Sequence, residues 1–179
     1  MKILTFLLTL SLLAFLPDSS NAASAQEIDA KVNQALKEFY HHSPAGKELA
    51  SKAAGVLVFP DVIKAGIGIG GEYGEGALRV GGKTAAYYNV ASASVGFQLG
   101  AQIKSEVLLF MSREALDKFQ KSDGWEAGVD GSFALVTVGA GGKIDSNTVQ
   151  QPIIGFIFSN KGLMYNLSIE GSKITLIDR

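Results

Sequence analysis

A glycine-rich segment in the middle third of the chain most limits the possible fold. Small residues alternate there with larger ones, as at Gly66, Gly68 and Gly70. This two-residue period is typical of a β-strand, and glycine inside a strand lets another backbone approach closely. The segment therefore predicts long strands in a twisted sheet, joined by a turn at Gly81-Gly82.

Helices are expected on both sides of this segment. Residues 24–40 carry apolar side chains at helical spacing, and Ser24 and Glu27 have the spacing of a capping box. A second helix is expected to begin after its cap residue, Ser43. A third helix is expected over residues 112–121, with Ser112 as its cap. The glycine-rich strands thus lie between helical segments.

The last third of the chain returns to strand-like patterns. The segment "PIIGFIFS" is apolar throughout, and a tight turn is expected at Asn160-Lys161-Gly162 before "LMYNLSIEGSKITLI". These two segments predict a hairpin. The chain is therefore expected to form one α+β domain: a mostly antiparallel, glycine-rich β-sheet, compatible with a barrel-like form, with N-terminal helices and one mid-chain helix.

The first 22 residues have the pattern of a secretory signal peptide. A basic start is followed by the uncharged apolar run 3–16, and then by small residues. This run of about 14 residues is shorter than the roughly 20 that span a bilayer. Cleavage is expected after Ala22, with Ala25 as the second choice. We therefore expect an exported protein, periplasmic or secreted, whose mature domain is residues 23–179.

Two glycine motifs resemble nucleotide-binding loops without their context. Residues 66–71 have the spacing Gly-x-Gly-x-x-Gly, and residues 77–84 approach the phosphate-binding loop. Both loops need a helix directly afterwards, because the phosphates bind at its N-terminal amides. Strand-like sequence follows in each case, so no nucleotide or dinucleotide cofactor is expected.

Other familiar chemistry has little support in the composition. The chain has no cysteine and only two histidines, His41 and His42, which as helix neighbours point about 100° apart. No metal site, cofactor or catalytic triad is therefore expected. The net charge of −1 argues against bulk attraction to nucleic acid. An outer-membrane barrel is disfavoured by the helices and by too few Tyr and Trp for two aromatic girdles.

Four long motifs resemble one known family. The segments "VIKAG", "GGEYGEGALRVGGKTAAYYNVASASVGFQLGAQ", "GWEAGVDGS" and "KGLMYNLSIEGSKI" are similar, in order, to the SYLF or YSC84-like domain. The likeness is closest to the exported bacterial branch and extends over the mature chain. It implies a non-enzymatic lipid-binding module, since eukaryotic members bind phosphoinositides and membranes and the yeast members bind actin.

The resemblance also implies candidate lipid-binding residues. The helix within 24–40 lies where the family has its membrane helix, and Lys64 falls in a family motif. Other cations of the sheet are candidates for a patch that binds anionic phospholipid. The candidates are Ile28, Val32, Leu36 and Phe39 on the helix, with Lys31 and Lys37, and Lys64, Arg79 and Lys83 on the strands.

Two alternatives stay open at this stage. The apolar stripe of the first helix either enters lipid or packs on the chain's own sheet, and a stripe of this kind favours the second arrangement. The function is either binding of an anionic lipid or membrane surface, or assembly through protein partners in the cell envelope. An enzyme with an unfamiliar site is the weakest class, given the scarcity of His and Cys.

Overall fold

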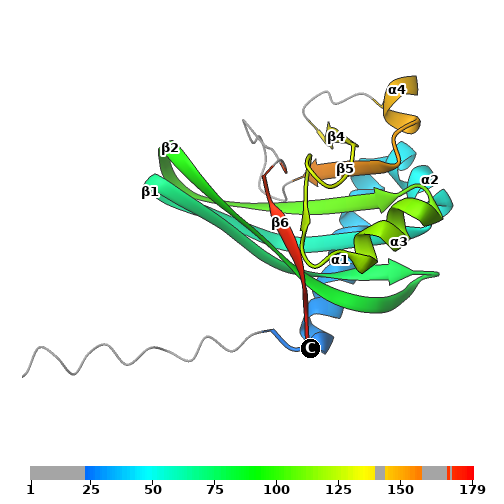
Figure 1. Ribbon diagram of the computed structural model, residues 1–179, viewed down its shortest axis with the longest axis horizontal. Coiled ribbons are helices and arrows are strands. Elements are labelled where there is room, and N and C mark those ends of the chain that lie inside the picture. Colours follow the sequence, from blue (N-terminus) through cyan, green and yellow to red (C-terminus); the bar gives the residue numbers. More distant parts are fainter. Residues whose placement is uncertain (1–22, 140–143, 159–168, 170) are drawn as a thin grey trace, which may run out of the picture.

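The computed structural model describes residues 23–139, 144–158, 169 and 171–179, with the side chains of 67–68 and 94–101 outside that description. It shows one α+β domain in which a curled sheet carries helices on its outside (Figure 1). The elements are α1 (Ala25–His42), α2 (Pro44–Lys52), β1 (Gly55–Val80), β2 (Lys83–Phe110), α3 (Arg113–Lys121), β3 (Trp125–Glu126), β4 (Phe133–Thr137), α4 (Ser146–Val149), β5 (Ile153–Phe158) and β6 (Lys173–Ile177).

Strands β1 and β2 form one long antiparallel ribbon. Their pairing runs from Gly55 opposite Phe110 to Val80 opposite Lys83. The expected turn is confirmed: φ is +58° at Gly81 and +79° at the next glycine, a backbone conformation that glycine adopts at little steric cost. The glycine-rich segment therefore builds the two longest strands of the protein.

The ribbon folds back on itself at its far end. The register shifts between Ile67 and Ile69, and a Cβ placed on Gly66 would overlap the backbone of Gly70. Further along, a Cβ on Gly76 would overlap the carbonyl oxygen of Val58. The first and second halves of β1 thus pack backbone against backbone, which confirms that the glycines serve close packing within the sheet.

Shorter strands extend both sides of the ribbon. The order is β3-β6-β2-β5-β4, with β1 pairing β2, and every pairing of these strands is antiparallel except the parallel pair β4–β5. The expected hairpin of the last two strand segments stays a prediction, because its turn at 160–162 and the start of its second strand lie outside the described residues. The described end of the last segment, β6, pairs with β2 and β3.

The helices begin where their caps predict. The hydroxyl of Ser24 accepts a hydrogen bond from the amide of Glu27, and Ser43 and Ser112 cap α2 and α3 in the same way. The short helix α4, capped by Asp145, was not predicted. None of the described helices has the length and hydrophobicity needed to cross a membrane.

The apolar stripe of α1 packs on the sheet. Ile28, Val32 and Phe39 are buried there, in a cluster that includes Val107 and Phe156. This is the arrangement that the sequence favoured. A second cluster, with α3, fills the other side of the folded ribbon. The sheet therefore carries a hydrophobic core on each face.

The backbone contact at Gly76 gives a testable difference between two glycines. Gly76→Val places atoms against the carbonyl of Val58, and we expect it to lower the free energy of unfolding by about 1–3 kcal/mol. Gly71→Val is the control, because the nearest atom to its Cβ is 3.7 Å away, and its effect should stay within about 0.5 kcal/mol. Urea unfolding followed by circular dichroism measures both, and equal losses would contradict the close packing.

Candidate functional site

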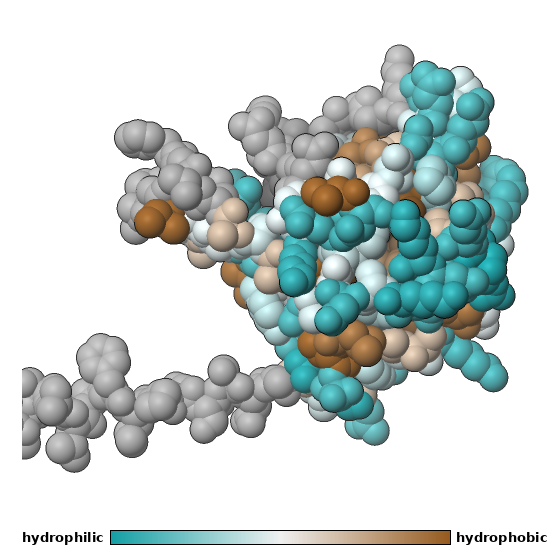
Figure 2. All heavy atoms as spheres, viewed as in Figure 1, coloured by the Kyte–Doolittle hydropathy of each residue, from teal (hydrophilic) through white to brown (hydrophobic). Residues whose placement is uncertain are grey.

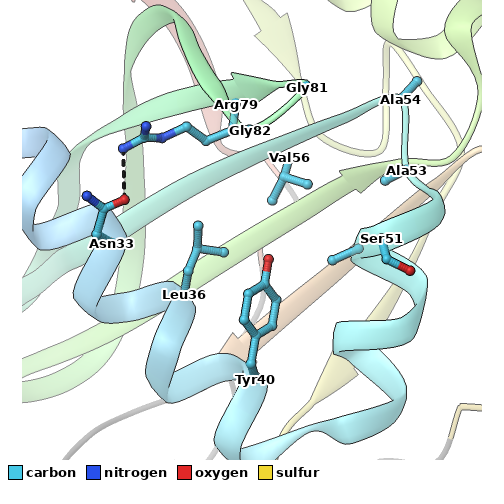
Figure 3. A pocket seen from close by; sticks show the side chains of 11 residues that line it. Asn33, Leu36, Tyr40, Ser51, Ala53, Ala54, Val56, Arg79, Gly81 and Gly82 are labelled. Carbon is cyan, nitrogen blue, oxygen red and sulfur yellow. Dashed lines mark hydrogen bonds between the residues drawn. The ribbon is translucent and has the colours of Figure 1, made fainter.

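A cleft lies between α1, α2 and the β1–β2 turn. Its volume is about 340 Å³, within the range of small-molecule pockets. Figure 3 shows α1 along one side, α2 on the other, and the glycines of the turn at the edge. The lining residues are Asn33, Leu36, Tyr40, Ala50, Ser51, Ala53, Ala54, Val56, Arg79, Gly81 and Gly82.

One part of the cleft is apolar. Leu36 and Val56 face each other across it, and the alanines at the end of α2 continue this surface (Figure 3). The hydroxyl of Tyr40 points into the space between them. Burial raises the pKa of Tyr40 above its usual value, so the hydroxyl keeps its proton and can donate a hydrogen bond.

The other part of the cleft is polar and is held by a cross-element network. Arg79 Nη2 donates to Asn33 Oδ1 and Asp29 Oδ1 of α1, at 3.2 Å each. Asp29 also accepts hydrogen bonds from Thr84 at 2.8 Å and from Tyr87 at 3.2 Å. This network fixes the guanidinium between the ribbon and α1.

The charge of the cleft is modest. Asp29 offsets much of the charge of Arg79, whereas Lys83, directly after the turn, is exposed. The cleft therefore combines an apolar wall, a tyrosine hydroxyl and a polar end with one offset cation. Such a lining suits a small amphiphile whose head accepts hydrogen bonds.

The structure separates the candidate residues into three groups. Leu36 and Arg79 both line the cleft, whereas Lys83 follows its glycine turn and is not part of the lining. The buried helix residues take part in the core and are covered in this fold. The remaining lysines lie elsewhere: Lys31 pairs with Glu27 at 3.2 Å and Asp61 at 3.7 Å, Lys37 is exposed on α1, and Lys64 is half-buried opposite Gln102 on the ribbon.

Sequence reasoning selected only Leu36 and Arg79 of the cleft lining and missed its other residues, among them Asn33, Tyr40 and Ser51. Asn33 and Tyr40 lie on the same helical face as Leu36, at spacings of three and four residues. Residues at this spacing form a second, narrower stripe on the helix beside the stripe that enters the core. The sequence alone could have revealed it. Ser51 had no such signal, because only the packing of α2 beside α1 brings it to the cleft.

A second cluster of charges is buried between the two halves of the ribbon. Lys104 Nζ lies 2.8 Å from an oxygen of Glu72 and 2.8 Å from an oxygen of Glu106. All three side chains are buried. Among the described residues the second carboxylate oxygen of Glu106 has no hydrogen-bond partner. Two carboxylates thus share one ammonium group away from water.

Burial sets the protonation of this cluster. It raises the pKa of Glu106 to about 7, an effect that Lys104 offsets only in part and Glu72 reinforces. Burial alone would lower the pKa of Lys104, but the two carboxylates raise it overall. The lysine therefore stays charged near neutral pH while Glu106 titrates there.

Stability should therefore decrease as pH rises toward neutrality. The folded pKa of Glu106 lies above the ordinary value of 4.5, so its contribution is complete below about pH 4.5 and is lost by the time pH passes about 7. The free energy of unfolding decreases by at most about 3 kcal/mol over this pH range. Urea unfolding between pH 4.5 and 8 measures it. Glu106→Gln should flatten the profile in this window, and an unchanged slope in that variant would contradict this assignment.

No group of three or more His, Cys, Asp or Glu in the described residues could hold a metal ion.

Residues 91–178, just under half of the chain, match the Ysc84 family model, described as "Las17-binding protein actin regulator". None of the curated proteins matches the chain. These residues are thus similar to the family that the sequence motifs resemble, a non-catalytic binding domain associated with lipid binding.

Proposed function

We propose that this chain, which carries a Ysc84 (SYLF) family domain in residues 91–178, is an exported, non-enzymatic protein that binds anionic lipid at a membrane surface of the cell envelope. The cleft between α1, α2 and the turn is the observation that carries the proposal. It binds one lipid molecule, with the apolar part against Leu36 and Val56 and the head toward Arg79.

The lining of the cleft supports this ligand class. A ligand without an apolar part would leave Leu36 and Val56 unused, and a purely apolar ligand would leave Arg79 and Tyr40 facing it without hydrogen bonds. A single-chain or partly extracted phospholipid satisfies both. Lys83 adds long-range attraction, worth about 1 kcal/mol for a lysine near an anionic surface.

Cleft filling tests the site. Ser51 is exposed at the edge of the cleft, so Ser51→Trp should occupy the space and weaken binding of lysophosphatidylglycerol at least tenfold. Ser51→Ala is the matched control, because it also removes the hydroxyl but adds no bulk, and its affinity should stay within twofold. Isothermal titration below the critical micelle concentration measures both. Equal affinity of the Trp variant and the parent would place the ligand elsewhere.

Vesicle retention tests the wider function. The parent should sediment with phosphatidylglycerol vesicles, and NaCl at about 0.5 M should release much of it, since salt screens exposed lysines. If the chain is retained by no vesicle of any composition, the lipid proposal is wrong. Assembly through a protein partner, the context that the family description names, would then be favoured.

Export rests on the signal-like segment 1–22, which lies outside the described residues. The first described residue, Ala23, packs beside the core cluster under α1, and Ser24 caps that helix, which supports a mature chain that starts at Ala23. Intact mass of the accumulated protein should show an N-terminus at Ala23. A stable protein that retains Met1 would contradict both cleavage and export in free form.

A further inference from the structure

The folded end of the β1–β2 ribbon projects from the body of the protein. Figure 1 shows it on the left, far from the helices that surround the cleft. We call residues 65–71 and 91–102 the ribbon tip. From Ile69 to Val80, beside the turn at the cleft, β1 runs for 12 residues, or about 35 Å at the rise of a strand.

The ribbon tip has no charged residue. Neither 65–71 nor 91–102 contains Asp, Glu, Lys or Arg, in a chain in which these residues make up 18%. Projecting strands in water normally carry charges, which keep their edges from associating. The absence of charged residues indicates that the ribbon tip contacts an environment less polar than water.

Large apolar side chains are exposed at and beside the tip. Ile69 is 74% exposed, the highest value among the exposed large hydrophobic residues of the described chain. Just behind it, Ile63 and Ile103 face each other in the ribbon, 52% and 42% exposed. Figure 2 shows apolar atoms at this projecting end, away from the strongly hydrophilic face of the body. The described side chains at and directly behind the tip therefore form an apolar surface around Ile69, Ile63 and Ile103.

Exposed polar groups lie directly behind the tip, on both halves of β1. Tyr73 is half-exposed, and its hydroxyl donates to Glu75 at 2.8 Å. Lys64, directly before the tip in the first half of β1, is half-buried opposite Gln102. The charged cluster of Lys104 is buried inside the ribbon at the same place, because its member Glu72 directly precedes Tyr73 on β1. An apolar end followed by an aromatic residue and a lysine is the order that side chains take across a membrane interface.

The first helix does not supply this surface. Its residues Ile28, Val32 and Phe39 are in the core, so lipid contact through that stripe would require the helix to leave the sheet. We propose that the ribbon tip, with Ile69 at its end, is the element that inserts into lipid when this protein binds a membrane. This rests on the proposed function and adds a membrane contact distinct from the cleft.

The depth of insertion follows from the backbone. Pairing of Ala65 with Ala101 and of Gly71 with Ala93 satisfies the amide groups that face the other strand. The outward-facing amides need water or headgroup oxygens, because an unsatisfied amide in hydrocarbon is costly. The tip therefore lies at the level of the headgroups and the first acyl carbons, about 5–10 Å deep.

A matched pair of substitutions tests the tip. Ile69→Asp puts a charge at the proposed contact and should weaken binding to phosphatidylcholine–phosphatidylglycerol vesicles at least about tenfold. Val129→Asp is the control, because Val129 is 71% exposed but lies on the body of the protein, after β3. Its affinity should stay within twofold. Vesicle sedimentation measures the affinities, and circular dichroism checks both folds.

A second readout reports insertion directly. The chain has no cysteine, so Ile69→Cys and Val129→Cys each accept one environment-sensitive label. Vesicles should shift the emission to the blue at position 69 and leave it unchanged at position 129. Equal vesicle binding by Ile69→Asp and the parent, or a label at 69 that stays in water, would overturn the proposal.

The outcomes separate this inference from the proposed function. Retention of the parent with an uninvolved tip leaves lipid binding in place and removes only the tip proposal. A parent that binds no vesicle removes both. If Ile69→Asp instead abolishes a concentration-dependent dimer of the free protein, seen by light scattering, and vesicle binding is unaffected, the tip is a contact between two copies and the inference is wrong.

Discussion

The contact of β1 with itself is the constraint on which the rest of this structure depends. Only a residue without a Cβ fits where Gly76 meets the carbonyl of Val58 and where Gly66 meets Gly70. Because of these contacts, the β1–β2 ribbon folds back into two layers. One hydrophobic core lies between the layers, and the other lies on the outer face, under α1. The cleft and the ribbon tip are the two ends of that doubled ribbon.

Much of the local structure could be predicted from the sequence, because its signals are local. Serine caps, helical spacing and the double-glycine turn each depend on neighbours within a few residues, and the structure has them where expected. The apolar stripe of α1 was also expected to pack on the sheet. The N-terminal segment and the lipid-binding role of the candidate residues remain predictions.

The candidate site was less predictable because it depends on distant residues. Arg79 was selected as a cation, but its partner Asp29 is 50 positions earlier, and nothing in the local sequence indicates the pair. The same applies to the buried cluster of Glu72, Lys104 and Glu106, whose members are drawn together only when the ribbon folds. The pairing of β6 with β2 was missed for this reason too.

The family match and the structural unit have different boundaries. The match begins at residue 91, inside β2, whereas β1, the first part of β2 and both N-terminal helices come earlier. A fragment limited to residues 91–178 would lack β1 and most members of the core cluster under α1. The domain that folds is therefore larger than the region that matches.

The double-glycine turn also has a consequence for how the chain reaches this state. Pairing next to Gly81-Gly82 closes a loop of a few residues, whereas pairing Gly55 with Phe110 closes one of more than fifty. The entropic cost of closing a loop increases with loop length. Pairing of β1 with β2 is therefore expected to start at the turn and extend outward, so that Gly55 and Phe110 pair late. Helix α1 packs against both ends of the paired strands, so its docking surface is absent until those ends have paired. The helix that resembles a membrane anchor would consequently spend the early folding period exposed, at the stage when a newly made chain is most in need of protection from aggregation.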